Sequence, residues 1–252
     1  MNMVIGEGVI FNRFIDYSFQ SKYFIIAGGV NESTINDEAA ILEEESSVAA
    51  ALSDYTDATF LYFSSCSILD PDVQHTQYVR HKLRMEKLIQ KTATNYFIFR
   101  LPQILGLSDT KKSLVSNFVD AIINHKKFEV WQNAKRNLID IDDVHEIVSE
   151  ILRRNIFNNR IVNIASPRQT AVLQLVRDIE DLTGCAANYA LVNKGSEYCI
   201  DISDIQPILV DLKLDFGKNY VLSSLRKYFQ HLICDPNRFP IIVPTHNVVQ
   251  EI

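Results

Sequence analysis

Short apolar runs alternate with segments that have the apolar spacing of helices, and this alternation constrains the fold more than any other feature of the chain. We predict strands at residues 2–6, 23–28, 59–64 and 96–101. We predict helices between them at residues 9–17, 36–52 and 75–92. Parallel strands need long crossover connections, which are usually helices, so this rhythm predicts an α/β fold: a parallel sheet with helices on both faces.

Small or polar residues stand where four of these strands are predicted to end, namely Gly6, Gly28, Ser65 and Pro102. The carboxyl ends of parallel strands lie along one edge of the sheet, and ligands of such sheets bind outside that edge. We therefore expect a binding site that these four positions share.

The first strand runs into Gly6-Glu-Gly8, and the apolar residues Val9 and Ile10 then open a helix. Glycines let a backbone turn tightly and approach a phosphate closely, so the unit could hold the pyrophosphate of a dinucleotide. Phe11 occupies the place of the third glycine of the usual G-x-G-x-x-G pattern. A plain buried turn is the alternative interpretation.

Tyr78 and Lys82 lie four residues apart on a predicted helix, after a strand that ends in Ser64-Ser65. Residues i and i+4 share one face of a helix, and a nearby ammonium favours the phenolate form of tyrosine. A serine at the strand end can hydrogen-bond the same substrate oxygen. The three groups suit general acid/base chemistry at a carbinol oxygen, which is half of a hydride transfer. An exposed helical pair is the alternative.

In this order the chain resembles an extended short-chain dehydrogenase/reductase of the NAD-dependent epimerase/dehydratase family, from about residue 3 to about residue 230. The matching segments are Gly6-Glu-Gly8, Phe24-Ile-Ile-Ala-Gly-Gly29, Ser64-Ser65, Tyr78 with Lys82, Phe99-Arg-Leu-Pro-Gln-Ile-Leu-Gly106, Arg136-Asn-Leu-Ile-Asp-Ile-Asp-Asp143 and Ile161-Val-Asn-Ile-Ala165. The resemblance implies a Rossmann-like core, an NAD(P)(H) cofactor and a nucleotide-activated sugar as substrate.

The resemblance also assigns roles to individual residues. It implies Ser65, Tyr78 and Lys82 as the catalytic group, with Ser64 as the other candidate for the serine. It implies that the cofactor contacts Gly6, Gly8, Val9, Ile10, Ala27, Gly28, Gly29, Tyr78, Lys82 and Pro102. It implies that the substrate contacts Ser64, Cys66, Gln103 and Arg136. Gln103 could instead be an ordinary loop amide, and Arg136 could form a surface salt bridge with Asp140 or Asp142.

The chain departs from the family pattern near its beginning, where only residues 15–22 separate the first helix from the strand at 23–28. Two strands of the family are missing there, together with the acidic residue that binds the adenosine ribose. The choice between NADH and NADPH stays open, because Arg13 and Lys22 could either meet a 2′-phosphate or be solvated surface charges. We predict a 4-keto sugar reductase; the alternatives are a 4-epimerase and a non-catalytic dinucleotide-binding protein.

Cys66 and Ser67 stand where the family's dehydratases carry Asp-Glu, which disfavours a 4,6-dehydratase. The net charge of −6 disfavours nucleic acid as a partner, and no apolar run is long enough for a membrane span. The four cysteines lack metal-site spacing, so we expect free thiols, no metal and a cytoplasmic enzyme of nucleotide-sugar and polysaccharide biosynthesis.

We expect three parts in the chain. A Rossmann-like cofactor-binding core covers 1–165, with a substrate-loop excursion at about 103–140. A small substrate lobe covers 166–234, and an extended tail covers 235–252. By analogy with the family, helices 36–52 and 75–92 could form a homodimer interface.

Overall fold

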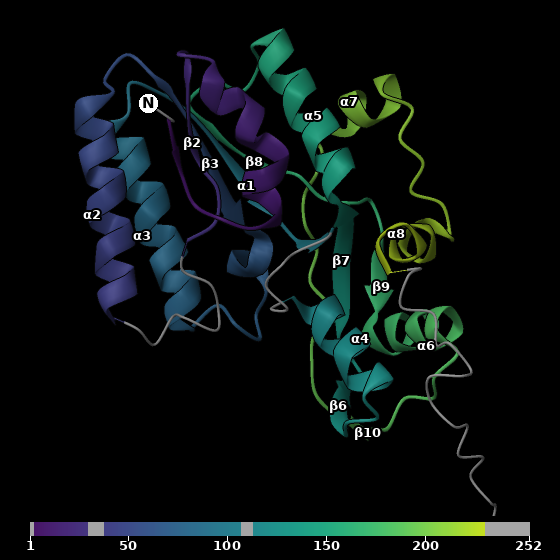
Figure 1. Ribbon diagram of the computed structural model, residues 1–252. Helices are drawn as coiled ribbons and strands as arrows, with labels where there is room; N and C mark the ends of the chain where they lie inside the picture. The colour runs from purple at the N-terminus through teal and green to yellow at the C-terminus, as the bar shows by residue number, and fades with distance from the viewer. Residues whose placement is uncertain (1–2, 30–37, 107–112, 230–252) are drawn as a thin grey trace, which may run out of the picture.

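The computed structural model describes residues 3–29, 38–106 and 113–229. A parallel sheet in the order β1-β2-β3-β4-β8 forms its centre (Figure 1). Its strands are β1 (Val4–Ile5), β2 (Tyr23–Ile26), β3 (Thr59–Ser65), β4 (Asn95–Leu101) and β8 (Arg160–Asn163). The predicted α/β, Rossmann-like architecture is confirmed, and each of the four predicted strands is present.

Helices cover both faces of this sheet (Figure 1). Short α1 (Val9–Phe14) and α5 (Ile141–Arg154) pack on one face, against Leu61 and Phe63. The helices α2 (Glu38–Asp54) and α3 (Gln77–Thr92) pack on the other face, against Phe60 and Tyr62. Successive side chains of a strand point to opposite faces, so the continuous apolar run of β3 supplies both cores.

The strand order never reverses in this sheet, because β1, β2, β3 and β4 follow one another from edge to edge. The β1–β2 connection passes over one face through α1, and the β2–β3 connection passes over the other face through α2. Two connections that advance in the same direction on opposite faces must have opposite hands. One of them is therefore left-handed, although about 98% of such crossovers are right-handed.

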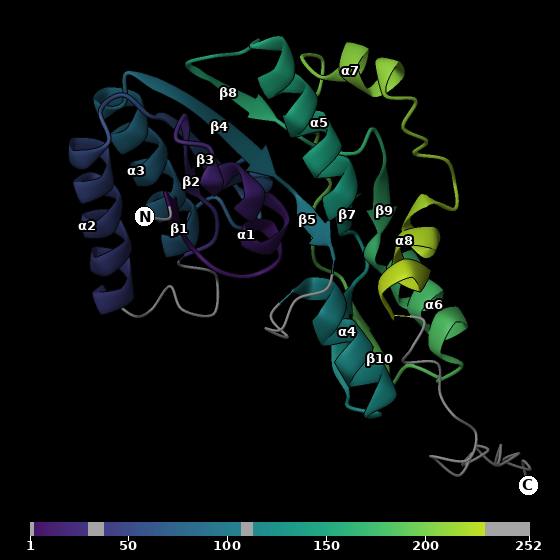
Figure 2. The same ribbon diagram turned by 45° about the horizontal axis from the view of Figure 1, so that its top comes forward.

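A second group of elements lies beside the carboxyl ends of the sheet (Figure 2). Its strands are β5 (Gln103–Leu105), β7 (Lys135–Asp140) and β9 (Gln169–Ala171) in one small sheet, and β6 (Phe128–Trp131) and β10 (Tyr189–Val192) in another. Its helices are α4 (Leu114–Ile123), α6 (Val172–Thr183) and α8 (Tyr220–Phe229), whereas α7 (Gln206–Asp211) lies apart from them, beside the last turn of α5. This group encloses the space above the strand ends.

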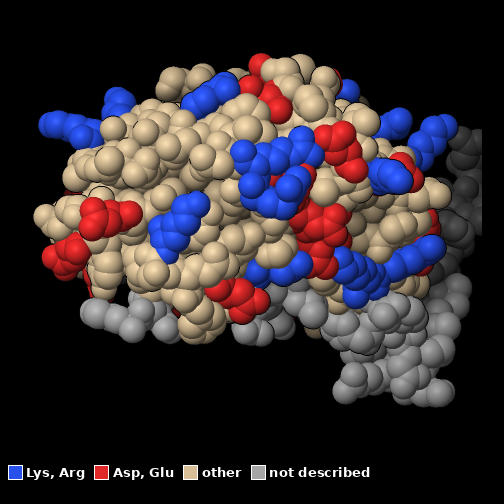
Figure 3. Space-filling model, turned by 90° about the horizontal axis from the view of Figure 1, so that it is seen from above, with Lys and Arg blue, Asp and Glu red and all other residues tan. Residues whose placement is uncertain are grey.

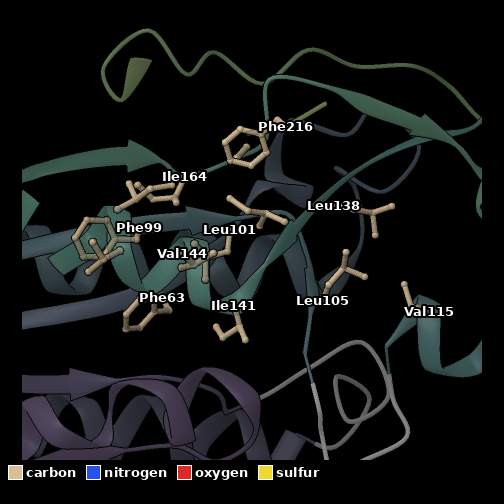
Figure 4. Packing of buried hydrophobic residues seen from close by; sticks show 14 of the residues in the cluster. Phe63, Phe99, Leu101, Leu105, Val115, Leu138, Ile141, Val144, Ile164 and Phe216 are labelled. Carbon is tan, nitrogen blue, oxygen red and sulfur yellow. The ribbon is translucent and has the colours of Figure 1, made fainter. Parts of the chain in front are cut away.

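One hydrophobic cluster joins the two parts (Figure 4). Phe63 and Phe99 from the sheet continue through Leu101 to Leu105 and Leu138 of the small sheet, and all five side chains are at most 3% exposed. The two parts therefore pack on one core. The boundary at residue 165 stays a prediction.

Some expectations need correction. The helix predicted at 9–17 ends at Phe14 and continues as a 3-10 helix, Ile15–Phe19. Cys66 and Cys199 are free, but Cys185 is disulfide-bonded, so the expectation of free thiols is wrong there. Sequence spacing does not reveal which cysteines meet in space. The tail at 235–252 lies outside the described residues.

The surface carries charges of both signs. Acidic and basic side chains lie next to one another on the face seen from above (Figure 3). Within the described ranges, none of the helices combines the length and apolar character that crossing a membrane requires.

Candidate active site

A cleft of about 250 Å³ opens where the carboxyl ends of the strands meet. The residues that line it include Gly8, Val9, Ile10, Gly28, Gly29, Tyr78, Lys82 and Pro102, together with Glu7, Ser64 and Ser65. The structure thus brings eight of the ten predicted cofactor contacts to one place. Gly6 and Ala27 do not line the cleft; they pack against each other behind it.

The backbone at and behind this cleft is packed too closely for a side chain at Gly6 and at Gly28. Gly6 has φ +129°, and a Cβ built there would lie 1.6 Å from the carbonyl oxygen of Ala27. Gly28 has φ +106°, and its Cβ would lie 2.6 Å from the backbone of Glu7. Gly8, at φ +91°, has open space where its Cβ would be. This bare backbone fits the approach of a pyrophosphate.

The fit is uneven along a dinucleotide. Tyr78 and Lys82 supply polar groups, and Pro102 an apolar surface, for a nicotinamide riboside beside the glycine turn. On the other side β1 is the edge of the sheet, and within the described ranges no strand pairs beyond it. The described residues therefore fit the nicotinamide and pyrophosphate half, with no platform for the adenosine.

A larger pocket of about 460 Å³ adjoins the cleft. Its lining includes Gln103, Trp131 and Arg136, with Asp70, Asn117, Glu129 and Tyr198, which the sequence did not single out. Ser65, Tyr78, Pro102 and Ser113 line both the pocket and the cleft. Groups at this junction can touch a ligand from either side.

Local structure places the two key side chains at the junction. Thr76 caps α3 by accepting a hydrogen bond from the Val79 backbone, so Tyr78 lies in the first turn of the helix. Ser65 ends β3, and its hydroxyl accepts a hydrogen bond from the Ser67 backbone at 3.1 Å. The Ser65 proton is then free to point to a substrate oxygen.

Lys82 lies below Tyr78, with only 5% of its side chain exposed. Its ammonium is 5.7 Å from the centres of both the Tyr78 and Tyr62 rings, and 3.9 Å from a carboxylate oxygen of Glu44. Burial alone would lower the pKa of Lys82, but Tyr62, Tyr78 and Glu44 raise it, and their attraction prevails. Lys82 is therefore a cation beside the tyrosine before the reaction.

Ser64 faces the opposite side of β3. Its hydroxyl donates to Glu86 at 2.6 Å, and Glu86 also accepts two hydrogen bonds from Arg100. Cys66 lines neither the cleft nor the pocket, because its buried thiol points to the Arg100 carbonyl oxygen at 3.3 Å. Burial raises the pKa of this thiol to about 12. Ser64 therefore lines the cleft but not the larger pocket, and Cys66 lines neither.

Arg136 is 14% exposed and lines the larger pocket from β7. Its guanidinium lies 3.8 Å from the Asp70 carboxylate, and burial raises the pKa of Asp70. The predicted alternative partners are occupied elsewhere, since Asp140 and Asp142 both contact Lys227. The surface salt-bridge alternative is therefore wrong. Gln103 lies in β5 and lines the same pocket.

Arg13, a candidate for a cofactor phosphate, donates a hydrogen bond to Asp142 at 2.6 Å. Lys22 lies over the Tyr23 ring at 5.1 Å. Neither cation lines the cleft.

Comparison with known proteins supports this geometry at the level of family and fold. A family model described as "NAD dependent epimerase/dehydratase family" matches residues 24–165, which is more than half of the chain. No curated protein matches the sequence.

Solved structures share the fold at low sequence identity. RMD from Pseudomonas aeruginosa complexed with NADPH has a TM-score of 0.66 and 15% identity, over 83% of this chain and 82% of that one. The UDP-glucose 4-epimerase of Thermus thermophilus in complex with NAD has a TM-score of 0.62 and 11% identity, over 88% and 81%. The dTDP-glucose 4,6-dehydratase of Bacillus anthracis has a TM-score of 0.62 and 9% identity, over 88% and 78%.

Proposed function

Because the chain belongs to the NAD-dependent epimerase/dehydratase family, we propose that it is an NAD(P)-dependent oxidoreductase that acts on a nucleotide-activated sugar. The specific reaction that we propose is reduction of a 4-keto sugar. One observation carries this proposal: Ser65 and Tyr78 line both the glycine cleft and the larger pocket. A sugar carbonyl at that junction would meet a proton donor and a hydride source together.

Each residue has a role that follows from its position. Tyr78 gives its phenolic proton to the keto oxygen as the alcohol forms. Ser65 donates a hydrogen bond that orients the same oxygen. Lys82 stabilises the tyrosinate that is left and binds the ribose next to the nicotinamide. The bound dinucleotide supplies the hydride. Arg136 and Gln103 hold the nucleotide diphosphate in the larger pocket.

The edge position of the glycine turn favours a reductase over a 4-epimerase. A reductase must exchange its cofactor at every turnover, whereas an epimerase regenerates it and can retain it. With β1 at the edge of the sheet, the adenosine half has little to hold it. A cofactor that is held weakly can leave after each turnover, as a reductase requires.

The experiment that tests the proposal begins with binding. NADPH and NADH are titrated separately, and energy transfer from Trp131 and the tyrosines to the nicotinamide reports binding. The preferred dinucleotide is then offered with 4-keto nucleotide sugars. Consumption of cofactor supports a reductase, and conversion without consumption supports a 4-epimerase. Absence of dinucleotide binding would contradict both and favour the non-catalytic alternative.

The mechanism is tested with Tyr78→Phe. We expect kcat to fall by roughly 100-fold or more, the usual contribution of a general acid, while the dissociation constant of the dinucleotide changes little. Tyr189→Phe is the matched control, because Tyr189 lies on β10 and lines neither the cleft nor the pocket. A Tyr78→Phe enzyme with full activity would overturn the mechanism.

A homodimer through α2 and α3 stays a proposal. Leu42 supports it, because this large apolar side chain on α2 is 61% exposed.

A further inference from the structure

The buried carboxylate of Glu44 lies next to Lys82, on the side away from the cleft, and the buried imidazole of His81 lies next to Glu44. Glu44 on α2 places one carboxylate oxygen 3.9 Å from the Lys82 ammonium. The other oxygen of Glu44 lies 2.9 Å from Nε2 of His81. The side chains of Glu44 and Lys82 are each 5% exposed, and His81 is 0% exposed. These groups join α2 to α3 inside the molecule.

The same line of groups continues to the surface. Nδ1 of His81 lies 3.3 Å from a carboxylate oxygen of Glu45, whose side chain is 31% exposed. Arg84, which is 55% exposed, donates a hydrogen bond to that oxygen at 2.9 Å. Lysine, carboxylate, imidazole and carboxylate thus follow one another from the cleft to the solvent.

The backbone leaves room for this arrangement. A Cβ built on Gly29 would lie 2.5 Å from the Glu44 carboxylate, so the carboxylate fills space that any other residue would take. The imidazole stands between two carboxylates, which accept hydrogen bonds and do not donate them. A ring nitrogen that carries a proton can donate to the carboxylate beside it, and the other ring nitrogen can take up a proton from the carboxylate on its own side.

We propose that Glu44, His81 and Glu45 form a proton relay that connects Lys82 to solvent. This inference rests on the proposed function, because it concerns how Tyr78 regains its proton. The relay runs through helix side chains and does not require the cleft to open. The 3.9 Å gap between Lys82 and Glu44 is a resting distance, and such contacts often tighten when ligands bind.

The protons balance over one turnover. The keto carbon takes a hydride from a reduced nicotinamide dinucleotide, and the keto oxygen takes the phenolic proton of Tyr78, which gives the alcohol. The Tyr78 phenolate takes a proton from Lys82, and Lys82 takes one from Glu44. Glu44 receives that proton from His81, and His81 takes up a new proton from water through Glu45. One solvent proton is consumed for each carbonyl reduced.

The first test separates a relay from a support. Glu44→Gln and His81→Gln keep similar shapes but cannot pass a proton. We expect kcat to fall roughly tenfold or more, KM to stay within about twofold, and the solvent deuterium isotope effect on kcat to rise. Glu44→Asp should restore part of kcat. Glu43→Gln is the matched control, because Glu43 lies on the same helix and is exposed. Unchanged kcat in Glu44→Gln, or a lower kcat with an unchanged isotope effect, would overturn the relay.

The second test does not depend on turnover. Nuclear magnetic resonance can follow exchange of the His81 ring N–H protons with water. A relay predicts rapid exchange in the wild type and exchange at least about tenfold slower in Glu45→Gln, with backbone amide exchange in α2 unchanged. Equal ring exchange in both proteins would overturn the relay. If the wild type reduces no 4-keto sugar, the proposed reaction fails, and ring exchange alone decides whether the buried groups conduct protons.

Discussion

Ser64 and Ser65 are adjacent in the chain but face opposite sides of the sheet, and only Ser65 lines the larger pocket as well as the cleft. Ser64 follows Tyr62 on the face that α3 covers, and Glu86 binds its hydroxyl. Ser65 follows Phe63 on the other face and reaches the junction. The period of two along a strand was readable in the sequence, but which face met the pocket depended on the packing of α3.

Arg136 gives a prediction at the scale of one residue. Arg136→Ala should raise KM for the nucleotide sugar by roughly tenfold to 100-fold, because hydrogen bonds to charged groups contribute about 1.5–3 kcal/mol. We expect kcat to change much less, since Arg136 lies in the larger pocket and does not line the cleft. Steady-state kinetics with a 4-keto nucleotide sugar would measure both constants.

Arg168→Ala is the control for Arg136→Ala, because Arg168 is exposed and lies outside the larger pocket. Arg136→Lys adds a second comparison, since lysine keeps the charge but loses the planar fork that fits a phosphate. If Arg136→Ala lowered kcat and left KM unchanged, the diphosphate role would be wrong.

At the scale of the elements, α1 is six residues long and depends on one anchor. Phe14 is 0% exposed, and its ring centre lies 4.6 Å from Phe63 and 5.1 Å from His145 of α5. Intrinsic helix formation is marginal at this length, so packing must hold the segment in place.

Phe14→Ala should therefore lower the free energy of unfolding by about 3–5 kcal/mol, the usual cost of deleting a buried phenylalanine. It should also weaken dinucleotide binding, because α1 carries the glycine turn. Urea denaturation and dinucleotide titration would measure the two effects. Phe19→Ala is the matched control, since Phe19 follows on the 3-10 helix with 70% exposure. Equal stability of both variants would contradict the anchor role.

The elements that the sequence predicted were the ones with strong local patterns. The strands β2, β3 and β4 are apolar on both faces, and α3 has a clear polar face, so their periods alone identified them. The short strands β5, β7 and β9 were not predicted. β7 begins Lys135-Arg136-Asn137, and its pairing with β9, which begins at Gln169, depends on contacts between distant segments.

Parts of the site were also hidden from the sequence. Tyr78 and Lys82 could be found from their spacing, because one helix carries both. Glu44 and His81 come from two different helices, and nothing in either segment indicates that their side chains meet. Contacts of that kind depend on how α2 packs on α3.

At the scale of the whole molecule, acidic residues at the start of α5 form ion pairs with both the central sheet region and the group of elements beside its carboxyl ends. Lys227 on α8 contacts Asp140 and Asp142, while Arg13 on α1 contacts Asp142 from the sheet side. Asp140 also caps α5 by accepting a hydrogen bond from the Asp142 backbone at 2.9 Å. Asp142 thus bridges the first and the last described helices.

This bridge predicts a pH dependence. Hydrogen bonds from Lys227 and Arg13 outweigh burial and lower the pKa of Asp142 below its unfolded value of about 3.9. The bridge therefore stabilises the fold above about pH 4, and the stabilisation is lost as the pH falls through the lower folded-state pKa. Asp142 is 42% exposed, so solvent screens the effect.

Urea denaturation of Asp142→Asn and the wild type at pH 7 and at about pH 3 would test this expectation. We expect the wild type to be more stable at pH 7, and the difference to shrink at pH 3 as the carboxylate takes up its proton. Asp57→Asn, at an exposed position, is the control. A difference that grows in acid would contradict the assigned sign.

The position of β1 has a consequence for how tightly a cofactor is held. Two residue pairs join β1 to β2, whereas seven join β3 to β4. The glycine turn therefore follows the strand with the shortest pairing in the sheet. An apparent dissociation constant equals the intrinsic one divided by the fraction of molecules in the binding-competent state. If the glycine turn held its binding conformation in half of the molecules, the apparent dissociation constant would be about twice the intrinsic one. Affinity would then be adjustable from outside the site: a longer pairing at the amino terminus would tighten binding without adding a single contact to the dinucleotide.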